Sequence, residues 1–199
     1  KQGLFNQDIR ALAVDPKNPQ LVYAGTPKGI FKSEDQGENW IEWFDQASGL
    51  KNVFINDLLI DPNQTEIIYA ATQGGLFVSY EGGDIWEPTG NESLKNESIQ
   101  TIQFSAAHPE QLILITTNNI FRSSDDRKLW ERKWSDLPKN ISSVITFKTD
   151  PEFIFTGTEK GFYKSFNGGI TWIKDENKNL KNIYSLAKDK INNSGIFLS

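Results

Sequence analysis

A fourfold internal repeat constrains this chain more than any other feature of its sequence. Each copy contains a threonine, three loop residues, two apolar residues, one variable residue and a serine, and a tryptophan follows seven residues after the serine. Successive serines lie 46, 44 and 42 residues apart. A period of this length is typical of proteins built from repeated supersecondary units. The four copies are residues 26–33, 72–79, 116–123 and 158–165, and their tryptophans are Trp40, Trp86, Trp130 and Trp172.

The apolar runs within each copy predict four short β-strands. In the first copy these runs are residues 9–14, 20–25, 29–33 and 40–44. Short runs rich in β-branched and aromatic residues, separated by glycine, proline, asparagine and aspartate, are typical of strands. No window has the apolar periodicity and the caps that a helix requires. The sequence therefore predicts an all-β fold.

Four strands per unit and a period in the low forties are the pattern of a β-propeller with four-stranded antiparallel blades. We predict a single propeller domain over residues 1–199, with about four and a half blades present. Such a chain would be an open arc, or part of a larger propeller completed by further residues or by a partner chain. The expected units are approximately residues 3–48, 49–93, 94–136, 137–178 and, incomplete, 179–199.

The connection between the third and fourth predicted strands carries the most specific pattern. In the first copy it runs from Ser33 to Trp40 and includes Asp35 and Gly37. A short carboxylate can accept hydrogen bonds from nearby backbone N–H groups, and glycine can adopt a positive φ. Tryptophan can be buried between neighbouring sheets. These residues predict a self-stabilised hairpin. The pattern resembles the Asp-box, or bacterial neuraminidase repeat, Ser-x-Asp-x-Gly-x-Thr-Trp.

The resemblance covers nearly the whole chain. It implies a propeller similar to photosystem assembly-factor-like proteins, sortilin-type receptor domains, sialidases and xyloglucan-cleaving glycosidases. It also implies that the box is a structural device at the blade periphery, away from any site. The later copies depart from the pattern, because Glu81 and Asn167 replace the aspartate and Arg127 replaces the glycine. The residues assigned this structural role are Ser33, Asp35, Gly37, Trp40, Ser79, Glu81, Gly83, Trp86, Ser123, Asp125, Trp130, Ser165, Asn167, Gly169 and Trp172.

The composition argues against several classes of function. The chain has no cysteine, which excludes disulfides, thiol catalysis and thiolate metal ligands. Its net charge of −5 argues against nucleic-acid binding, which needs a basic face. The single histidine, His108, precedes a proline and argues against a serine triad or a histidine metal site. We therefore expect no cofactor and no metal. No apolar run approaches the roughly 18 residues of a membrane helix.

The charged residues allow two enzymatic interpretations to be weighed. A sialidase needs a cluster of arginines that clamps the substrate carboxylate, but only Arg10 lies on a predicted innermost strand and the other three arginines fall in one unit. We reject that activity. A glycosidase needs only two carboxylates that face one cleft. Asp57 and Asp8 are candidates, and a solvated channel residue is the alternative interpretation of each.

Polar side chains of the predicted innermost strands are the other candidates for a binding site. These strands are residues 9–14, 55–60, 99–104 and 183–188. Two tryptophans outside the repeated position could stack on sugars, anchor a protein partner or pack the outer strand of a blade. The candidate binding residues are Arg10, Asn56, Asp57, Gln100, Thr101, Tyr184, Ser185, Trp43 and Trp134.

The function that the sequence favours is a non-catalytic scaffold for protein–protein interaction outside the cytoplasm. Its partner would be another protein or the remaining propeller blades, with a glycan as a further candidate. The alternative is a carbohydrate-active protein, either a glycan-binding module or a fragment of a glycosidase that uses paired carboxylates. Asparagine sequons fit an extracytoplasmic location and lie at Asn63, Asn91, Asn96, Asn140 and Asn192.

Overall fold

The computed structural model has β-structure throughout the residues that it describes. These are residues 3–4, 8–43, 48–50, 54–90, 92–94, 97–106, 108–124, 127–134, 140–177, 180–188 and 196–198. No α-helix occurs within these ranges, and a short 3-10 helix, η2 (Glu92–Leu94), precedes the third sheet. The all-β prediction is therefore confirmed.

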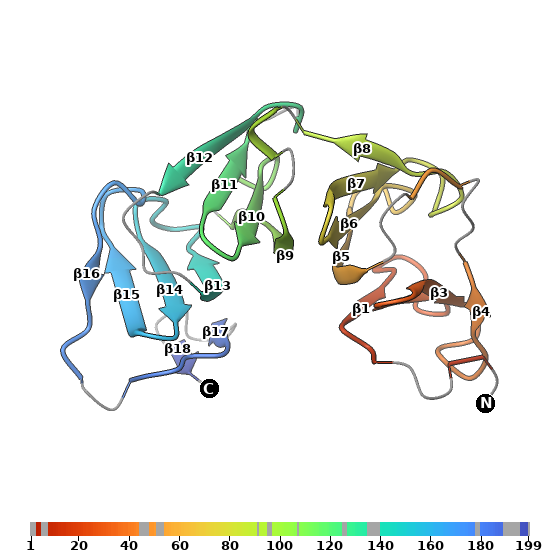
Figure 1. The fold of residues 1–199 in the computed structure, drawn as a ribbon, viewed down its shortest axis with the longest axis horizontal. Coiled ribbons are helices and arrows are strands. Elements are labelled where there is room, and N and C mark those ends of the chain that lie inside the picture. Colours follow the sequence, from red (N-terminus) through yellow and green to blue (C-terminus); the bar gives the residue numbers. More distant parts are fainter. Residues whose placement is uncertain are drawn as a thin grey trace. The chain divides into compact units, whose positions relative to one another are not determined.

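The strands form four antiparallel sheets of four strands each, and consecutive strands are neighbours in every sheet (Figure 1). We call these sheets blades 1 to 4. A two-stranded sheet follows, so the predicted four and a half units are present. Blade 1 is β1 (Ala11–Val14), β2 (Val22–Thr26), β3 (Gly29–Ser33) and β4 (Ile41–Glu42); blade 2 is β5 (Ile55–Ile60), β6 (Ile68–Thr72), β7 (Gly75–Ser79) and β8 (Glu87–Thr89); blade 3 is β9 (Ile99–Phe104), β10 (Leu112–Thr116), β11 (Ile120–Ser123) and β12 (Trp130–Trp134); blade 4 is β13 (Ile141–Thr146), β14 (Ile154–Thr158), β15 (Gly161–Ser165) and β16 (Ile173–Lys174); the last pair is β17 (Leu186–Lys188) and β18 (Ile196–Leu198).

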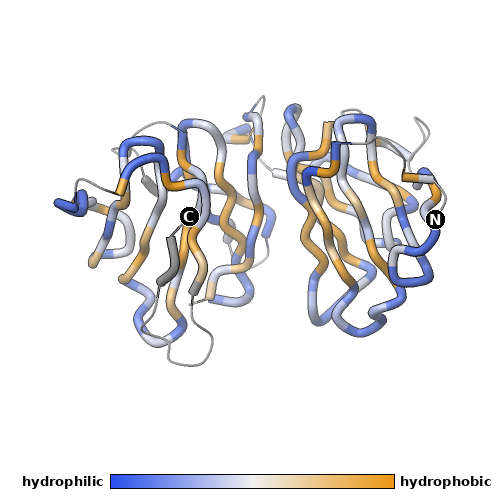
Figure 2. The backbone as a smooth tube through the Cα atoms, turned by 90° about the horizontal axis from the view of Figure 1, so that it is seen from below, coloured by the Kyte–Doolittle hydropathy of each residue, from blue (hydrophilic) through white to orange (hydrophobic). Residues whose placement is uncertain are grey.

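Burial falls from the second strand of a blade to its fourth. Every residue of β2, β6 and β10 is buried, whereas both residues of β4 and of β16 are exposed. A strand that is covered on both faces reads as a continuous apolar run and not as an alternating one. Figure 2 shows hydrophobic residues along the strands and hydrophilic residues in the turns.

The first strand of each blade agrees with the sequence prediction in two blades and is shorter in two other units. β5 and β9 span the predicted ranges, whereas β1 begins at Ala11 and β17 begins at Leu186. The backbone N–H of Arg10 still donates to Gly25 at 2.9 Å, so the ladder continues one residue before β1. Ile183 lies outside β17, and its N–H donates to the carbonyl of Thr158 in blade 4 at 3.1 Å.

The repeated threonine closes the turn between the second and third strands. In blade 1 the Thr26 hydroxyl donates to the carbonyl of Gly29 at 3.0 Å and accepts from the N–H of Lys28 at 3.1 Å. A threonine hydroxyl that bonds nearby backbone in this way stabilises a tight turn. This explains why all four copies keep the residue. The equivalent threonines are Thr72, Thr116 and Thr158.

The chain divides into two compact units, Lys1–Ile102 and Gln103–Ser199. In the first unit one apolar cluster joins blades 1 and 2, and it includes Ile55, Leu58 and Trp86. In the second unit another cluster joins blades 3 and 4, and it includes Ile120 and Ile141. Each core therefore lies between adjacent blades.

Two glycines let neighbouring blades approach closely. A Cβ on Gly25 of blade 1 would lie 2.6 Å from a methyl group of Ile55, and a Cβ on Gly157 of blade 4 would lie 2.5 Å from a methyl group of Ile183. Contacts this short do not occur between real side chains. The two residues occupy equivalent positions in their second strands, so the same packing solution occurs in both units.

Candidate functional site

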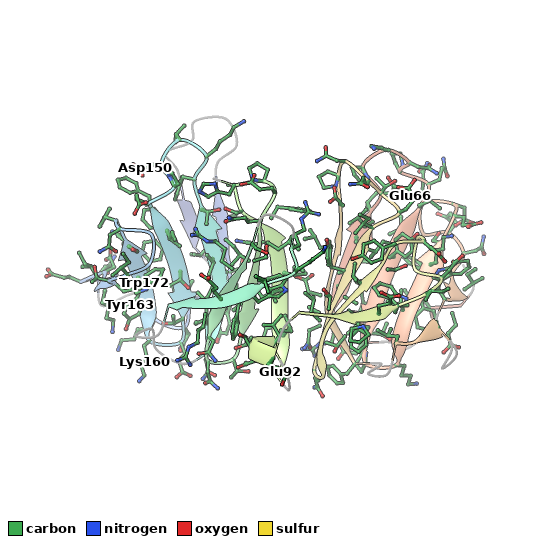
Figure 3. All side chains as sticks on the ribbon, turned by 90° about the horizontal axis from the view of Figure 1, so that it is seen from above. Glu66, Glu92, Asp150, Lys160, Tyr163 and Trp172 are labelled. Atoms are coloured by element: carbon green, nitrogen blue, oxygen red, sulfur yellow. The ribbon has the colours of Figure 1, made fainter. Side chains whose placement is uncertain are left out.

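Each blade has two ends that carry different connections. The outer turn, which joins the third and fourth strands, lies at the same end as the turn between the first and second strands, because antiparallel neighbours reverse direction at each hairpin. The opposite end, which we call the linker end, carries the turn between the second and third strands and the linker to the next unit. In blade 4, Figure 3 shows Asp150 at the first of these ends and Lys160 at the linker end.

The outer turn of blade 1 is closed by Ser33 and Asp35. The serine hydroxyl donates to the Asp35 carboxylate at 2.8 Å and accepts from the N–H of Gly37 at 2.8 Å. The carboxylate also accepts from the backbone N–H of Asn39 at 2.8 Å and from its side-chain amide at 2.7 Å. The hydrogen bonds from Asn39 and Ser33 lower the pKa of Asp35 from its ordinary value of 3.8 to about 2.

Blade 4 builds the same outer turn with a neutral side chain. The Asn167 amide oxygen accepts from the Ser165 hydroxyl at 3.0 Å and from the N–H of Thr171 at 2.9 Å. The Ser165 hydroxyl accepts from the N–H of Gly169 at 2.8 Å. An amide oxygen therefore replaces the carboxylate of Asp35 in each of these roles.

Blade 2 keeps only the serine part of the turn. The Ser79 hydroxyl accepts from the N–H groups of Glu81 at 3.2 Å and Gly83 at 2.9 Å. Within the described part of the chain, no hydrogen bond joins the Glu81 carboxylate to the turn. The extra methylene of glutamate accounts for this difference from blade 1.

Blade 3 rebuilds its outer turn around Arg127, which stands where the other blades have glycine. Arg127 adopts a φ of 59°, a conformation that costs energy for a residue with a side chain. Its Nε donates to the carbonyl of Glu110 at 2.9 Å, and its guanidinium lies 5.1 Å from the ring centroid of Phe104. In the other blades the equivalent carbonyl accepts from a turn N–H, as in the bond from Gln36 to Gln20. Asp125 lies outside the described residues.

The repeated tryptophans differ in burial. Trp86 and Trp130 are 2% and 1% exposed, whereas Trp40 and Trp172 are half-buried. Trp40 donates from its indole Nε1 to the carbonyl of Gly37 at 3.0 Å. Trp86 belongs to the apolar cluster between blades 1 and 2, and burial of the repeated indoles is deepest in blades 2 and 3.

The two further tryptophans lie on or beside fourth strands. Trp43 is half-buried; the Lys32 ammonium lies 4.0 Å from its ring centroid, and a Cβ on Gly83 of the blade 2 outer turn would lie 3.1 Å from its ring. Trp134 ends β12, where it pairs with Ile120, and its side chain lies outside the described part of the structure.

Asn56 joins blade 2 to the first strand of the next sheet. Its side-chain amide is buried and donates to the carbonyl of Ile99 at 2.7 Å. Ser142 holds the same position in blade 4, and its hydroxyl donates to the carbonyl of Ile183 at 2.6 Å. The ladder register shifts at both positions, so each residue forms a β-bulge. We call these two contacts interblade clasps.

Asp57, next to Asn56, also bonds the first strand of the next sheet. Its carboxylate accepts from the backbone N–H groups of Ile102 at 3.0 Å and Leu58 at 2.9 Å, and from the Thr101 side chain. Burial raises the pKa of Asp57 above its ordinary value of 3.8, and these hydrogen bonds act in the opposite direction. The side chain is half-buried, and its acceptor sites are engaged by protein groups.

The remaining candidates are exposed or half-buried. Arg10 is exposed, with its guanidinium 5.0 Å from the ring centroid of Phe54 and 3.8 Å from the carboxylate of Asp8. Gln100 donates locally to the Ser98 hydroxyl at 3.1 Å. Tyr184 is 75% exposed. Ser185 and Thr101 are exposed and half-buried respectively.

The linker end of blade 4 has a pocket of about 220 Å³, which the sequence analysis does not predict. The β14–β15 turn, the end of β16 and the linker that follows form its wall. Lysines are too common on surfaces to mark such a recess in a sequence. The glycine that ends the β14–β15 turn is the one local signal. The lining residues are Lys160, Lys174, Asp175, Glu176, Asn177, Leu180 and Lys181.

Two features are absent from the described residues. They contain no helix of sufficient length and hydropathy to cross a bilayer. They also contain no group of three or more histidine, aspartate or glutamate side chains arranged to hold a metal ion.

Comparison with known proteins identifies the fold. No protein-family model and no curated protein match the chain. The extracellular domain of the hybrid two component system BT3049 from B. thetaiotaomicron is 18% identical, with a TM-score of 0.78, over 99% of this chain and 28% of that one. YCF48 bound to D1 peptide is 19% identical, with a TM-score of 0.67, over 100% of this chain and 63% of that one. The fold is a β-propeller.

A carbohydrate enzyme shares this propeller fold. The GH74 xyloglucanase from Xanthomonas campestris is 16% identical, with a TM-score of 0.74, over 96% of this chain and 35% of that one. The chain therefore spans between 28% and 63% of the length of these three structures. At such identities the likeness concerns the fold alone, and propellers with different functions share it.

Proposed function

We propose that this chain is a non-catalytic Asp-box propeller that acts as a scaffold for protein–protein interaction outside the cytoplasm. The placement of Asp57 carries the proposal, because it is the only acidic residue in the first strands β1, β5, β9, β13 and β17. Its carboxylate accepts hydrogen bonds from Ile102, Leu58 and Thr101. A glycosidase commonly needs two carboxylates that face one substrate, and these strands offer one that is already engaged.

The outer turns support the Asp-box assignment. In blades 1 and 4 a serine hydroxyl and an aspartate or asparagine oxygen bond the backbone of the same turn. All of these bonds stay within one hairpin. The turns are therefore structural devices in this proposal, and the ligand contacts lie elsewhere.

Two of the similar structures support a partner outside the cytoplasm. One is described as an extracellular domain, and the other was solved with a bound peptide. The chain also exposes large apolar side chains at the end of blade 4 that carries the outer turn, where Phe153 and Phe166 pack edge to face with ring centroids 5.1 Å apart and Ile170 is exposed. Exposed apolar groups of this kind are common at interaction surfaces.

A paired assay tests the proposal. The purified chain is incubated with xyloglucan and other β-glucans while new reducing ends are counted, and a displayed peptide library is selected on the same protein. We expect peptides that compete with one another for the chain, and no more reducing ends than the Asp57→Asn variant releases. Hydrolysis that Asp57→Asn abolishes would contradict the proposal, as would a selection that enriches no peptide.

The proposed location has its own test. Protease added to intact source cells should digest the chain if it lies outside the cytoplasm, while a cytoplasmic marker protein stays intact. Protection of the chain until the cells are lysed would contradict an extracytoplasmic role.

A carbohydrate-active protein is the second candidate, and the raised pKa of Asp57 favours it. A general acid in a glycosidase needs a carboxyl group that stays protonated near neutral pH, and burial shifts Asp57 in that direction. A glycan array separates glycan binding from catalysis: binding that survives Asp57→Asn would indicate a glycan-binding module rather than an enzyme.

A further inference from the structure

The pocket at the linker end of blade 4 is built by a close approach of two backbone segments. Gly161, at the start of β15, has a φ of 129°, and a Cβ there would lie 2.7 Å from the carbonyl oxygen of Leu180 and 3.2 Å from Cε of Lys174. Asn182 and Ile183 donate backbone hydrogen bonds to Glu159 at 3.1 Å and Thr158 at 3.1 Å. The linker is therefore hydrogen-bonded to the end of β14 and to the β14–β15 turn, and the recess lies between them.

Two of the acidic groups around this recess, Asp175 and Glu159, are already engaged. Asp175 accepts from the ammonium of Lys164 at 2.6 Å and from the N–H of Asn177 at 3.0 Å, and these contacts lower its pKa below the ordinary value. Lys164 does not line the pocket. Glu159 accepts from the side-chain amide of Asn140 at 2.6 Å. Glu176 is the remaining carboxylate of the lining.

The lysines of the pocket are not neutralised in the same way. Lys160, Lys174 and Lys181 all line the recess and are exposed. Among the described residues, none of the three makes an ion pair with a carboxylate. The recess is therefore a positive spot on a chain whose net charge is −5, and such a spot attracts anionic groups.

We propose that this lysine pocket binds the carboxylate side chains of an acidic peptide segment in a protein partner. The inference rests on the proposed scaffold function and specifies the partner's chemistry. A volume of about 220 Å³ is below the range of typical small-molecule sites and suits one or two side chains. Leu180 supplies an apolar wall beside the ammonium groups, so an aliphatic residue next to the acidic one would also be covered.

The lining argues against two other kinds of ligand, a sugar and a phosphate group. Among its described residues there is no aromatic side chain on which a sugar ring could stack. The described lining also has no arginine, whose planar fork gives bidentate contacts with phosphate. Single ammonium groups on flexible stems are suited to separate carboxylates.

Binding of a defined probe tests the proposal. The probe is a fluorescein-labelled, end-blocked peptide of alternating glutamate and leucine, and its anisotropy is measured with the full chain at 25 and 250 mM NaCl. We expect Lys160→Gln, Lys174→Gln and Lys181→Gln each to weaken binding about threefold, the effect of one exposed ion pair. The matched control is Lys28→Gln, at the equivalent position of the blade 1 turn, and it should leave binding unchanged. Binding should also weaken at the higher salt concentration.

A pair of glycine variants tests the shape of the pocket separately from its charge. Gly161→Ala and Gly75→Ala replace equivalent glycines with positive φ values of 129° and 120°, but a Cβ on Gly75 meets nothing within 4 Å. Both variants should lose similar backbone stability. Only Gly161→Ala should weaken binding of the probe, because its Cβ would displace the linker and Lys174.

Several outcomes would overturn the inference. Equal loss of binding with Lys28→Gln and the pocket variants would show that the peptide binds elsewhere. Tighter binding of oligogalacturonate than of the peptide, through the same lysines, would make the ligand an acidic glycan. If peptides selected from the library bind but the acidic probe does not, this inference fails while the scaffold proposal stands. Hydrolysis that depends on Asp57 would instead remove the scaffold proposal.

Discussion

At the scale of single residues, the outer turns of blades 1 and 4 show one geometry made by two side chains. Asp35 and Asn167 both accept from a serine hydroxyl and from a backbone N–H four residues later. Only Asp35 carries a charge that its surroundings stabilise, and hydrogen bonds lower its pKa to about 2. The geometry is shared, but the response to pH should differ between the two blades.

Exchanging these side chains should therefore move the pH dependence of stability. The folded pKa of Asp35 is lower than its ordinary value of 3.8, so the ionised turn stabilises the chain above about pH 4 and loses that contribution as the pH falls towards about 2. Asp35→Asn should flatten the stability profile over this interval, and Asn167→Asp should steepen it. Urea unfolding at each pH measures both. Parallel profiles for the wild type and Asp35→Asn would contradict this assignment.

Positive φ values give a second residue-scale prediction. Gln36 has a φ of 61° where blades 2 and 4 have Gly82 and Gly168. Gln36→Gly should raise the unfolding free energy by about 0.5–1 kcal/mol, because it relieves a left-handed conformation.

Arg127→Gly is the informative comparison for that prediction. It relieves the same kind of strain but removes the hydrogen bond to Glu110 and the contact with Phe104. We expect no gain, since one hydrogen bond is worth about 1 kcal/mol. Denaturant unfolding measures both variants, and an equal gain from the two would show that the Arg127 contacts contribute nothing.

At the scale of elements, each interblade clasp links a β-bulge in the first strand of one blade to the backbone of the unit that follows. Asn56 and Ser142 lie where the ladder register shifts, and each donates to the carbonyl of an isoleucine that follows its own blade, Ile99 or Ile183. A bulge turns a side chain out of the regular alternation. In this chain the turned side chain is the donor that joins two sheets.

Removal of an interblade clasp should lower the unfolding free energy more when the hydrogen bond is buried than when it is exposed. Asn56→Ala should lower the unfolding free energy by about 1–3 kcal/mol, because it removes a buried donor from the carbonyl of Ile99. Gln100→Ala, at the equivalent position of β9, should cost less than about 1 kcal/mol since its bond to Ser98 is local and half-exposed. Thermal or urea unfolding measures both, and equal losses would show that the clasp is not what stabilises blade 2.

The strands could be predicted from sequence, but the clasps could not. Apolar runs and turn residues determine β2, β6 and β10, whose side chains are all buried. A bulge leaves that apolar pattern unchanged, so Asn56 and Asp57 were both candidates for the channel. The available signal was the pair itself: two adjacent polar residues cannot both face the same side of a regular strand. Which of the two turns away depends on the neighbouring blade.

At the scale of the molecule, equivalent residues differ in burial because their blades differ in their neighbours. Leu12 and Leu58 hold the same position in β1 and β5, yet Leu12 is 63% exposed and Leu58 is 5% exposed. Blade 1 presents Ala11 and Ala13 to the cluster that contains Leu58. In a repeat array the stability of a unit depends on the interfaces that it shares.

The two leucines should respond very differently to truncation. Leu58→Ala should cost about 2–4 kcal/mol, because it opens a cavity in the core between blades 1 and 2. Leu12→Ala should cost less than about 0.5 kcal/mol in the isolated chain, since the side chain is already in water. Unfolding in urea compares them. A large loss of unfolding free energy from Leu12→Ala would mean that another surface covers the Leu12 face of blade 1 in solution.

The linker-end pocket shows where inference from sequence stops for the site. Gly161 is visible as a turn residue, but its second role, admitting the carbonyl of Leu180, depends on the path of a linker some twenty residues later. In the sequence, the lysines that line the pocket look like ordinary surface residues. They make the pocket positive because one nearby carboxylate, Asp175, is paired with Lys164. Charge balance in three dimensions is not recoverable from composition.

The interblade clasps use a peptide carbonyl as the acceptor, and this has an evolutionary consequence. Every amino acid has a backbone carbonyl oxygen. The donor side chain can therefore change from the amide of Asn56 to the hydroxyl of Ser142 without a matching substitution in the unit that accepts the hydrogen bond. Copies of the repeat can diverge independently, one at a time. Covariation between Asn56 and Ile99 across descendants of this gene should accordingly be absent, although the two groups are bonded.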